Sequence, residues 1–218
     1  MRVFGAASFA SALTEMETAF EQRSPNIDVQ LVLAGSSALR LQILEGAPAD
    51  VYVSADETNM NELIAGGAAT TSATVARNTM QLAVPTGNPA GVDGLGDLSD
   101  DDLLVGLCAE TVPCGRFARQ VLANAGVTAS VDTNEADVRS LLTKIGAGEL
   151  DAGIVYASDV AITDDVDGLD IAADVNVVTA APVAVLTESS APIAAAAFVD
   201  FMLSPDGQSI LAHNGFAA

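Results

Sequence analysis

The hydrophobic positions along the chain follow two spacings in turn, one typical of strands and one typical of helices. Apolar runs such as Asp50–Ser54 have the length of short buried strands, whereas apolar residues recur every three or four positions from Phe9 to Phe20. The pattern predicts strands near residues 3–4, 26–33, 50–54, 81–85, 103–108, 151–156 and 176–186, the last broken at Pro182. It predicts helices near residues 9–20, 39–44, 56–64, 116–125, 137–146, 193–201 and 206–213, with Asp56 as a cap and a further helix start at 98–102. This alternation indicates an α/β fold with a parallel sheet and helices on its faces.

Two β-rich runs, near residues 81–85 and 177–186, are long enough to pass between two lobes. We therefore predict a discontinuous first lobe made of residues 1–82 and 182–218, and an inserted second lobe made of residues 83–181. Two crossover strands would join them. Clefts between such lobes are the usual ligand sites, so we expect the functional residues there.

The charge of the chain restricts its partners. It has 29 acidic and 8 basic residues among 218, a formal net charge of −21, although half of its residues are hydrophobic. That hydrophobic content predicts a folded core rather than disorder, and the longest apolar runs, 177–186 and 191–199, are too short to span a membrane. So few basic residues exclude nucleic acid as a partner. Taken alone, the charge also argues against a small anion as ligand.

The two cysteines lie six residues apart, on either side of a turn at Pro113. Cys108 and Cys114 lack the CxxC spacing of metal sites, and His213, the only histidine, is far along the chain. We expect a short-loop disulfide, with two free thiols as the alternative, and no bound metal cation. A disulfide would favour an oxidising compartment.

Three strand-to-helix turns carry small or polar residues: 5–8, 35–37 and 112–115. The first turn of a helix exposes N–H groups that have no acceptor within the helix, at the positive end of the helix dipole. A serine there can be no more than an N-cap. Because several such turns recur at the carboxyl ends of parallel strands, they predict one crevice that binds an anion without lysine or arginine.

Motifs of enzymes are missing from the sequence. It contains no GxSxG, P-loop, GxGxxG or HExxH pattern. His213 is expected at the surface and Tyr52 in the core, and the scattered carboxylates are typical of a solvated surface. Tyr156 ends a predicted strand, where it is either a core residue or a neutral donor to a cleft. We therefore predict that the protein is not an enzyme.

Several segments match one known family. The most specific is Gly46–Asp56, with the sequence GAPADVYVSAD, and the others are residues 3–8, 35–39, 112–115, 135–139, 152–159, 201–205 and 215–216. Through these segments, nearly end to end, the chain resembles the bacterial periplasmic molybdate-binding proteins, the substrate-binding components of molybdate ABC transporters. The resemblance implies a type II periplasmic-binding-protein fold, in which two α/β lobes close on a tetrahedral oxyanion.

The resemblance also implies which residues bind the oxyanion. Two serines of the first lobe bind it in the family, and their positions fall on Ser8 and Ser36, with the adjacent Ser37 ranked lower. The second lobe contributes two backbone N–H groups and a tyrosine hydroxyl. These positions fall on Cys114, Val138 and Tyr156. Many relatives carry alanine at the position of Cys114. Since the contact there is made by the main chain, the change keeps the donor, and a bridge to Cys108 would stiffen the turn that presents it.

By this resemblance the protein would capture molybdate, and tungstate with it, and deliver it to an ABC permease with a cytoplasmic ATPase. We expect a monomer without a cofactor, outside the cytoplasm, either periplasmic or anchored by lipid. Residues 1–4 show no signal-peptide pattern, so the leader is expected to be absent from this sequence. One alternative is the same fold binding sulfate or another tetrahedral oxyanion. A less favoured one is an enzyme or regulatory effector module built on similar lobes.

Overall fold

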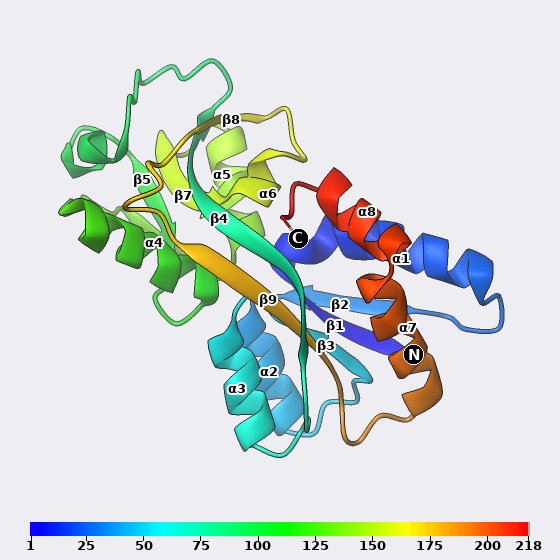
Figure 1. The fold of residues 1–218 in the computed structure, drawn as a ribbon. Coiled ribbons are helices and arrows are strands. Elements are labelled where there is room, and N and C mark those ends of the chain that lie inside the picture. Colours follow the sequence, from blue (N-terminus) through cyan, green and yellow to red (C-terminus); the bar gives the residue numbers. More distant parts are fainter. Residues whose placement is uncertain (218) are drawn as a thin grey trace. The chain divides into compact units, whose positions relative to one another are not determined.

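The computed structural model describes residues 1–217 and forms two compact units. Unit 1 contains Met1–Arg77 and the chain from Thr179 onward, and unit 2 is Asn78–Val178. The chain leaves unit 1 within strand β4 (Ala73–Pro85) and returns to it at the start of β9 (Val178–Val185), as the colours of Figure 1 show. Among the residues described, no helix has the length and apolar character needed to cross a membrane.

Unit 1 is built on a sheet with the strand order β2-β1-β3-β9. Besides β9, the strands of this sheet are β1 (Arg2–Ala6), β2 (Gln30–Ala34) and β3 (Val51–Val53). β1 lies between β2 and β3 and is parallel to both, while β9 is antiparallel to β3. All three residues of β3 are buried, as expected for a strand covered on both faces.

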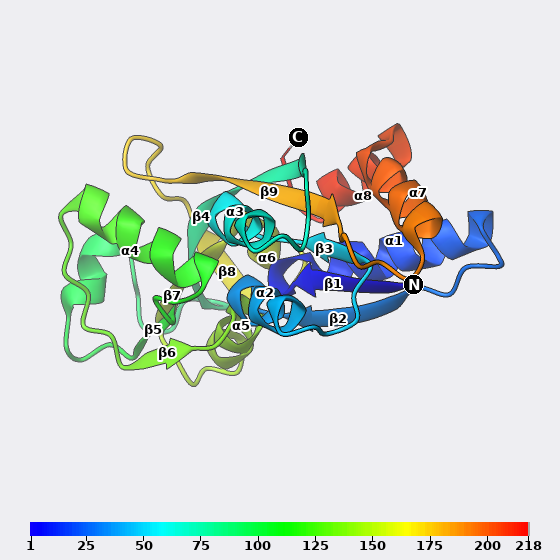
Figure 2. The same cartoon turned by 90° about the horizontal axis from the view of Figure 1, so that it is seen from below.

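Helices cover both faces of this sheet (Figures 1 and 2). They are η1 (Ala7–Phe9), α1 (Ala10–Arg23), α2 (Ser36–Leu44), α3 (Glu57–Ala65), α7 (Pro192–Leu203) and α8 (Pro205–His213). Neighbouring residues of β1 show which helices cover which face of the sheet, because successive side chains along a strand point to opposite faces. Phe4 packs with Leu39 of α2 and Leu63 of α3. Gly5 faces α1, where a Cβ would lie 2.2 Å from the Leu13 Cδ1 atom.

Unit 2 has its own sheet, with the order β6-β5-β7-β4-β8. Its strands besides β4 are β5 (Val105–Cys108), β6 (Thr133–Glu135), β7 (Ala152–Tyr156) and β8 (Val166–Leu169). β5 is parallel to β6 and β7, whereas β4 is antiparallel to β7 and β8. The helices are η2 (Leu95–Ser99), α4 (Pro113–Ala125), α5 (Val138–Gly146) and α6 (Ala157–Val160). Each of the strands β5, β6 and β7 is followed within a few residues by a helix.

Three sequence predictions were wrong at element boundaries. The helix predicted from Arg116 begins at Pro113, because proline suits the first turn of a helix, so residues 113–115 are helical rather than a turn. The strand predicted over 26–33 begins at Gln30. β9 continues through Pro182 instead of breaking there, and the Pro182 carbonyl oxygen accepts a hydrogen bond from the Ser54 N–H group at 2.9 Å.

The helix start predicted at 98–102 was also wrong. The chain forms the 3-10 helix η2 instead, which ends at Ser99. The Asp97 carboxylate accepts hydrogen bonds from the N–H groups of Asp93 at 2.7 Å and Gly94 at 3.2 Å. Within the predicted range, the Asp100 Oδ1 atom accepts a hydrogen bond from the Asp102 N–H group at 3.0 Å, so this side chain also closes a turn, as aspartate often does.

Candidate functional site

In unit 1 two predicted site residues follow neighbouring parallel strands. Ala6, the last residue of β1, pairs with Ala34, the last residue of β2. The chain then enters η1, which contains Ser8, and α2, which begins at Ser36. Because both helices start where paired strands end, the two serines leave the same edge of the sheet. Both are buried, with 6% of Ser8 and 1% of Ser36 exposed.

Ser36 is held at both its side chain and its carbonyl. Its Oγ accepts a hydrogen bond from the Ala55 N–H group at 3.0 Å. Its carbonyl oxygen accepts one from the Tyr52 hydroxyl at 2.9 Å. A serine hydroxyl has one donor and two acceptor positions. With Oγ accepting from Ala55, the Ser36 hydroxyl hydrogen remains available to donate to a ligand.

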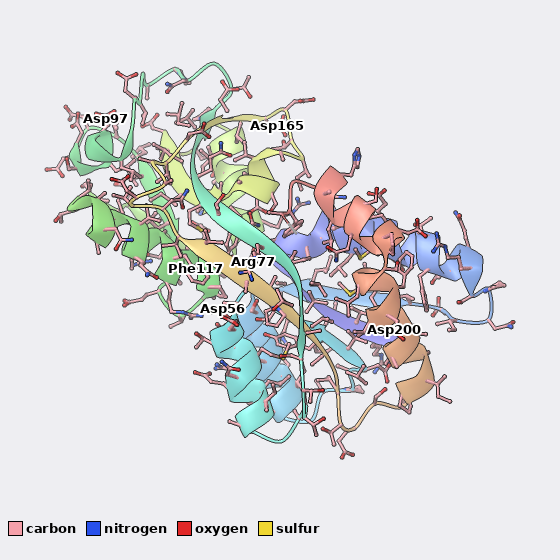
Figure 3. The ribbon with its side chains drawn as sticks, in the orientation of Figure 1. Asp56, Arg77, Asp97, Phe117, Asp165 and Asp200 are labelled. Atoms are coloured by element: carbon pink, nitrogen blue, oxygen red, sulfur yellow. A yellow bond between two sulfur atoms is a disulfide. The ribbon has the colours of Figure 1, made fainter. Side chains whose placement is uncertain are left out.

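Tyr52 and Asp56 support this arrangement from the segment Val51–Asp56. Tyr52 is fully buried, as predicted, and burial raises the pKa of its hydroxyl well above its ordinary value of 10.0, so it remains a donor. Asp56 caps α3, also as predicted, and accepts from the Asn59 N–H group at 3.0 Å (Figure 3). The capped helix and the buried tyrosine together fix the Ala55 N–H group that reaches Ser36.

In unit 2 three helix starts also share one sheet edge. β5 ends at Cys108 and pairs in parallel with β6, which ends at Glu135, and with β7, which ends at Tyr156. The helices α4, α5 and α6 begin a few residues beyond these strand ends. Cys114 lies in the first turn of α4 and Val138 is the first residue of α5. These two residues and Tyr156 are buried, with at most 3% exposed.

The helix starts differ in how they are capped. Side chains cap α3, α5 and α8, through Asp56, Asp137 and Ser204. In contrast, α2 follows Gly35 and α4 follows Val112, and neither helix receives a side-chain cap hydrogen bond. The N-cap residues of α2 and α4 therefore place no side-chain acceptor at the positive end of each helix dipole, which favours an anion there.

The predicted disulfide between Cys108 and Cys114 is confirmed, with a Cα–Cα distance of 5.8 Å. It joins the last residue of β5 to the second residue of α4. The alternative of two free thiols was wrong. His213 is exposed, as predicted. Within residues 1–217, no group of three or more histidine, cysteine or acidic side chains is arranged to hold a metal ion.

Asp159 is a buried carboxylate that the sequence analysis did not single out. It is fully buried in α6, and its Oδ2 atom accepts a hydrogen bond from the Tyr156 N–H group at 3.2 Å. Its Oδ1 atom has no hydrogen-bond partner among the described residues. Burial raises its pKa to about 7, against the lowering effects of the Tyr156 N–H group and the Arg139 charge. An acidic residue three positions after a helix cap is the signal that could have indicated it.

Comparison with known proteins shows the family. The model of the bacterial extracellular solute-binding protein family matches residues 1–217. The molybdate-binding protein ModA of Mycobacterium tuberculosis (strain H37Rv) is 35% identical over 217 residues, which cover 99% of this chain and 83% of that protein. The chain belongs to this family of solute-binding proteins. The predicted family resemblance is therefore confirmed.

Solved structures show the same fold. The substrate-binding domain of a putative molybdenum ABC transporter from Clostridium difficile has a TM-score of 0.74 and 26% identity, covering 100% of this chain and 97% of that one. The sulfate-binding protein SubI of Mycobacterium tuberculosis has a TM-score of 0.88 and 17% identity, covering 99% of this chain and 85% of that one. The predicted α/β periplasmic-binding-protein fold is confirmed. At 17% identity the second likeness shows the fold alone.

Proposed function

We propose that this protein captures molybdate, and tungstate with it, outside the cytoplasm and delivers it to an ABC permease driven by a cytoplasmic ATPase. The observation that carries the proposal is the 35% identity to a molybdate-binding protein over 99% of the chain. The protein would act as a monomer without a cofactor, in the periplasm or anchored to a membrane by lipid. It would bind and release its ligand without a catalytic step.

The proposed ligand set is the hydroxyls of Ser8 and Ser36, the backbone N–H groups of Cys114 and Val138, and the Tyr156 hydroxyl. We propose that one anion accepts hydrogen bonds from all five. Molybdate is a dianion without a proton near neutral pH, so it only accepts hydrogen bonds. A shell made of donors alone satisfies it, whereas a protonated phosphate would also need an acceptor. Support comes from the burial of these residues and from the helix starts on which they lie.

Sulfate is the second candidate ligand, because it is also a tetrahedral dianion and a sulfate-binding protein shares the fold. It is smaller than molybdate, so in a site of fixed size it leaves some donors without an acceptor. Each buried donor left without a partner costs about 1–3 kcal/mol. Tungstate is nearly the size of molybdate and should bind comparably.

The net charge of −21 does not weigh against an anionic ligand. It makes the long-range field repulsive, which slows the encounter with a dianion. Salt screens that field beyond about 10 Å at 0.1 M ionic strength. At the site itself, hydroxyls and helix dipoles determine the affinity.

Thermal unfolding in the presence of molybdate, tungstate, sulfate and phosphate tests the proposed function. A ligand that binds the folded state at 100 times its Kd stabilises it by about 2.7 kcal/mol. We expect a clear rise in Tm with molybdate and tungstate, a small one with sulfate, and none with phosphate. An equal rise with sulfate would favour the alternative, and no rise with any oxyanion would contradict the proposal.

A further inference from the structure

The first turn of α4 is fastened to the end of β5 by two separate connections. The disulfide joins the side chains of Cys108 and Cys114. Arg119, one turn further along α4, also joins the start of α4 to the end of β5, because its side chain binds a main-chain carbonyl oxygen in each. Its Nη1 donates to the Cys108 carbonyl oxygen at 2.8 Å and to the Gly115 carbonyl oxygen at 2.9 Å. The first connection is a covalent bond and the second is a pair of charge-assisted hydrogen bonds, and both restrain the start of α4.

Close packing adds a third restraint at Gly115. A Cβ atom on this residue would lie 2.0 Å from the Ala109 carbonyl oxygen and 2.5 Å from the Cys108 carbonyl oxygen. The start of α4 therefore rests directly on the backbone that leaves β5. A hydrogen bond from the Val112 N–H group to the Ala109 carbonyl oxygen, at 3.1 Å, closes the intervening turn.

Arg119 also connects this turn to the next strand. Its Nη2 donates to the Asn134 Oδ1 atom of β6 at 2.5 Å. The guanidinium group thus contacts α4, β5 and β6 at once, and its fork of donors suits this role better than a point charge would. The neighbouring Arg116 has a hydrogen bond to a different part of the chain. Its Nη1 donates to the Thr111 carbonyl oxygen, within the exposed turn itself, at 3.2 Å.

We propose that Arg119 and the Cys108–Cys114 disulfide form a clamp that fixes the Cys114 N–H group and thereby sets the preference for molybdate over sulfate. This inference rests on the proposed function, which makes that N–H group a donor to the oxyanion. Arg119 is a positioning residue, because it acts on the backbone of α4 and β5. A donor held at a fixed place cannot follow a smaller anion inward. A released turn can move toward sulfate, and it also holds molybdate less well.

The test is isothermal titration calorimetry with molybdate and with sulfate on four variants. Arg119→Gln removes the fork, and Arg119→Lys restores a cation that can reach a carbonyl oxygen. The double variant Cys108→Ala and Cys114→Ala removes the disulfide without bringing thiol reductants into contact with molybdate. Arg116→Gln removes the same charge from the same helix and is the matched control. Circular dichroism and Tm establish that each variant folds.

We expect Arg119→Gln and the cysteine double variant each to weaken molybdate binding about tenfold, while sulfate binding changes little. The ratio of the two affinities should therefore fall about tenfold, recover in part in Arg119→Lys, and stay unchanged in Arg116→Gln. General destabilisation would weaken both anions equally and leave the ratio unchanged. If Arg119→Gln does not fold, the cysteine variant decides alone.

The outcomes separate the clamp from the proposed function. If the wild-type protein binds molybdate but the affinity ratio is unchanged in Arg119→Gln and in the cysteine variant, the clamp is wrong and the proposed function stands. A fall in the ratio equally large in Arg116→Gln would also overturn the clamp, because it would trace to charge alone. If the wild-type protein binds no oxyanion, both proposals fail.

Discussion

The Tyr52 hydroxyl donates a hydrogen bond to the Ser36 carbonyl oxygen at 2.9 Å, in the interior of unit 1. Tyr52 comes from the middle of β3 and Ser36 from the first turn of α2. A buried residue of the sheet thus fixes a residue proposed to bind the ligand. The predicted core role of Tyr52 is confirmed, and this contact adds a second role to it.

The variant Tyr52→Phe tests that second role. It leaves the buried Ser36 carbonyl without this donor, which should lower the free energy of unfolding by about 1–3 kcal/mol. We expect molybdate affinity to fall about tenfold as well, because the Ser36 hydroxyl loses its fixed position. Denaturant unfolding and calorimetry measure the two effects. Lower stability with unchanged affinity would show that the bond serves the fold alone.

Asp50 joins the ends of three elements in unit 1. Its carboxylate accepts hydrogen bonds from the Arg2 N–H group at 2.7 Å, the Ser189 hydroxyl at 2.7 Å and the Ala191 N–H group at 3.1 Å. Burial alone would raise its pKa, but these bonds and one from Ser190 outweigh it and hold the pKa below the ordinary value of 3.8. The ionised form is therefore the stabilising one.

We expect Asp50→Asn to lower the free energy of unfolding by about 1–3 kcal/mol at neutral pH. Because the folded-state pKa is lowered, the wild-type advantage is present above pH 4 and is lost as the pH falls below that value. Urea unfolding from pH 3 to pH 7 measures it. The control is Asp206→Asn, whose exposed ion pair with Arg23 should matter by less than about 1 kcal/mol. Equal losses in the two variants would contradict this role.

Asp159 should make stability depend on pH in the opposite direction. Its pKa is raised to about 7 by burial, from the ordinary value of 3.8. Ionising it costs more in the folded than in the unfolded protein, so its contribution to stability should fall as the pH rises from about 4 to about 7. Asp159→Asn should remove this decline, whereas the exposed Asp165→Asn should keep it. Urea unfolding from pH 4 to pH 8 measures the decline, and an unchanged decline in Asp159→Asn would contradict the assignment.

Periodicity in the sequence predicted the elements whose apolar residues face a core, such as β3, α5 and α7. It missed short strands whose residues are polar. β6 is Thr133–Glu135, and β8 is Val166–Leu169 with a glycine and an aspartate inside it. The first half of β4 was missed because Thr74, Arg77 and Asn78 interrupt its apolar pattern. Strands of this kind form because neighbouring strands supply their hydrogen bonds, which a local pattern does not contain.

The sequence predicted the local features of the site, but it did not predict the contacts between residues that are far apart in the chain. The turn sequences indicated helix starts, and the cysteine spacing indicated the disulfide. The bond from Tyr52 to Ser36 and the bonds from Arg119 to Cys108 join residues 11 or more positions apart, on different elements. Only the tertiary fold brings such residues together. These contacts do not touch the proposed ligand, so its chemistry did not indicate them either.

Calorimetric titration of molybdate into wild-type protein and into Ser8→Ala and Ser36→Ala tests the central claim most directly. Each substitution removes a proposed hydroxyl donor to a dianion, and a hydrogen bond to a charged group contributes about 1.5–3 kcal/mol. We predict that each variant binds molybdate at least tenfold more weakly, while the neighbouring Ser37→Ala changes the affinity less than about twofold. Unchanged affinity in both Ser8→Ala and Ser36→Ala would contradict the account.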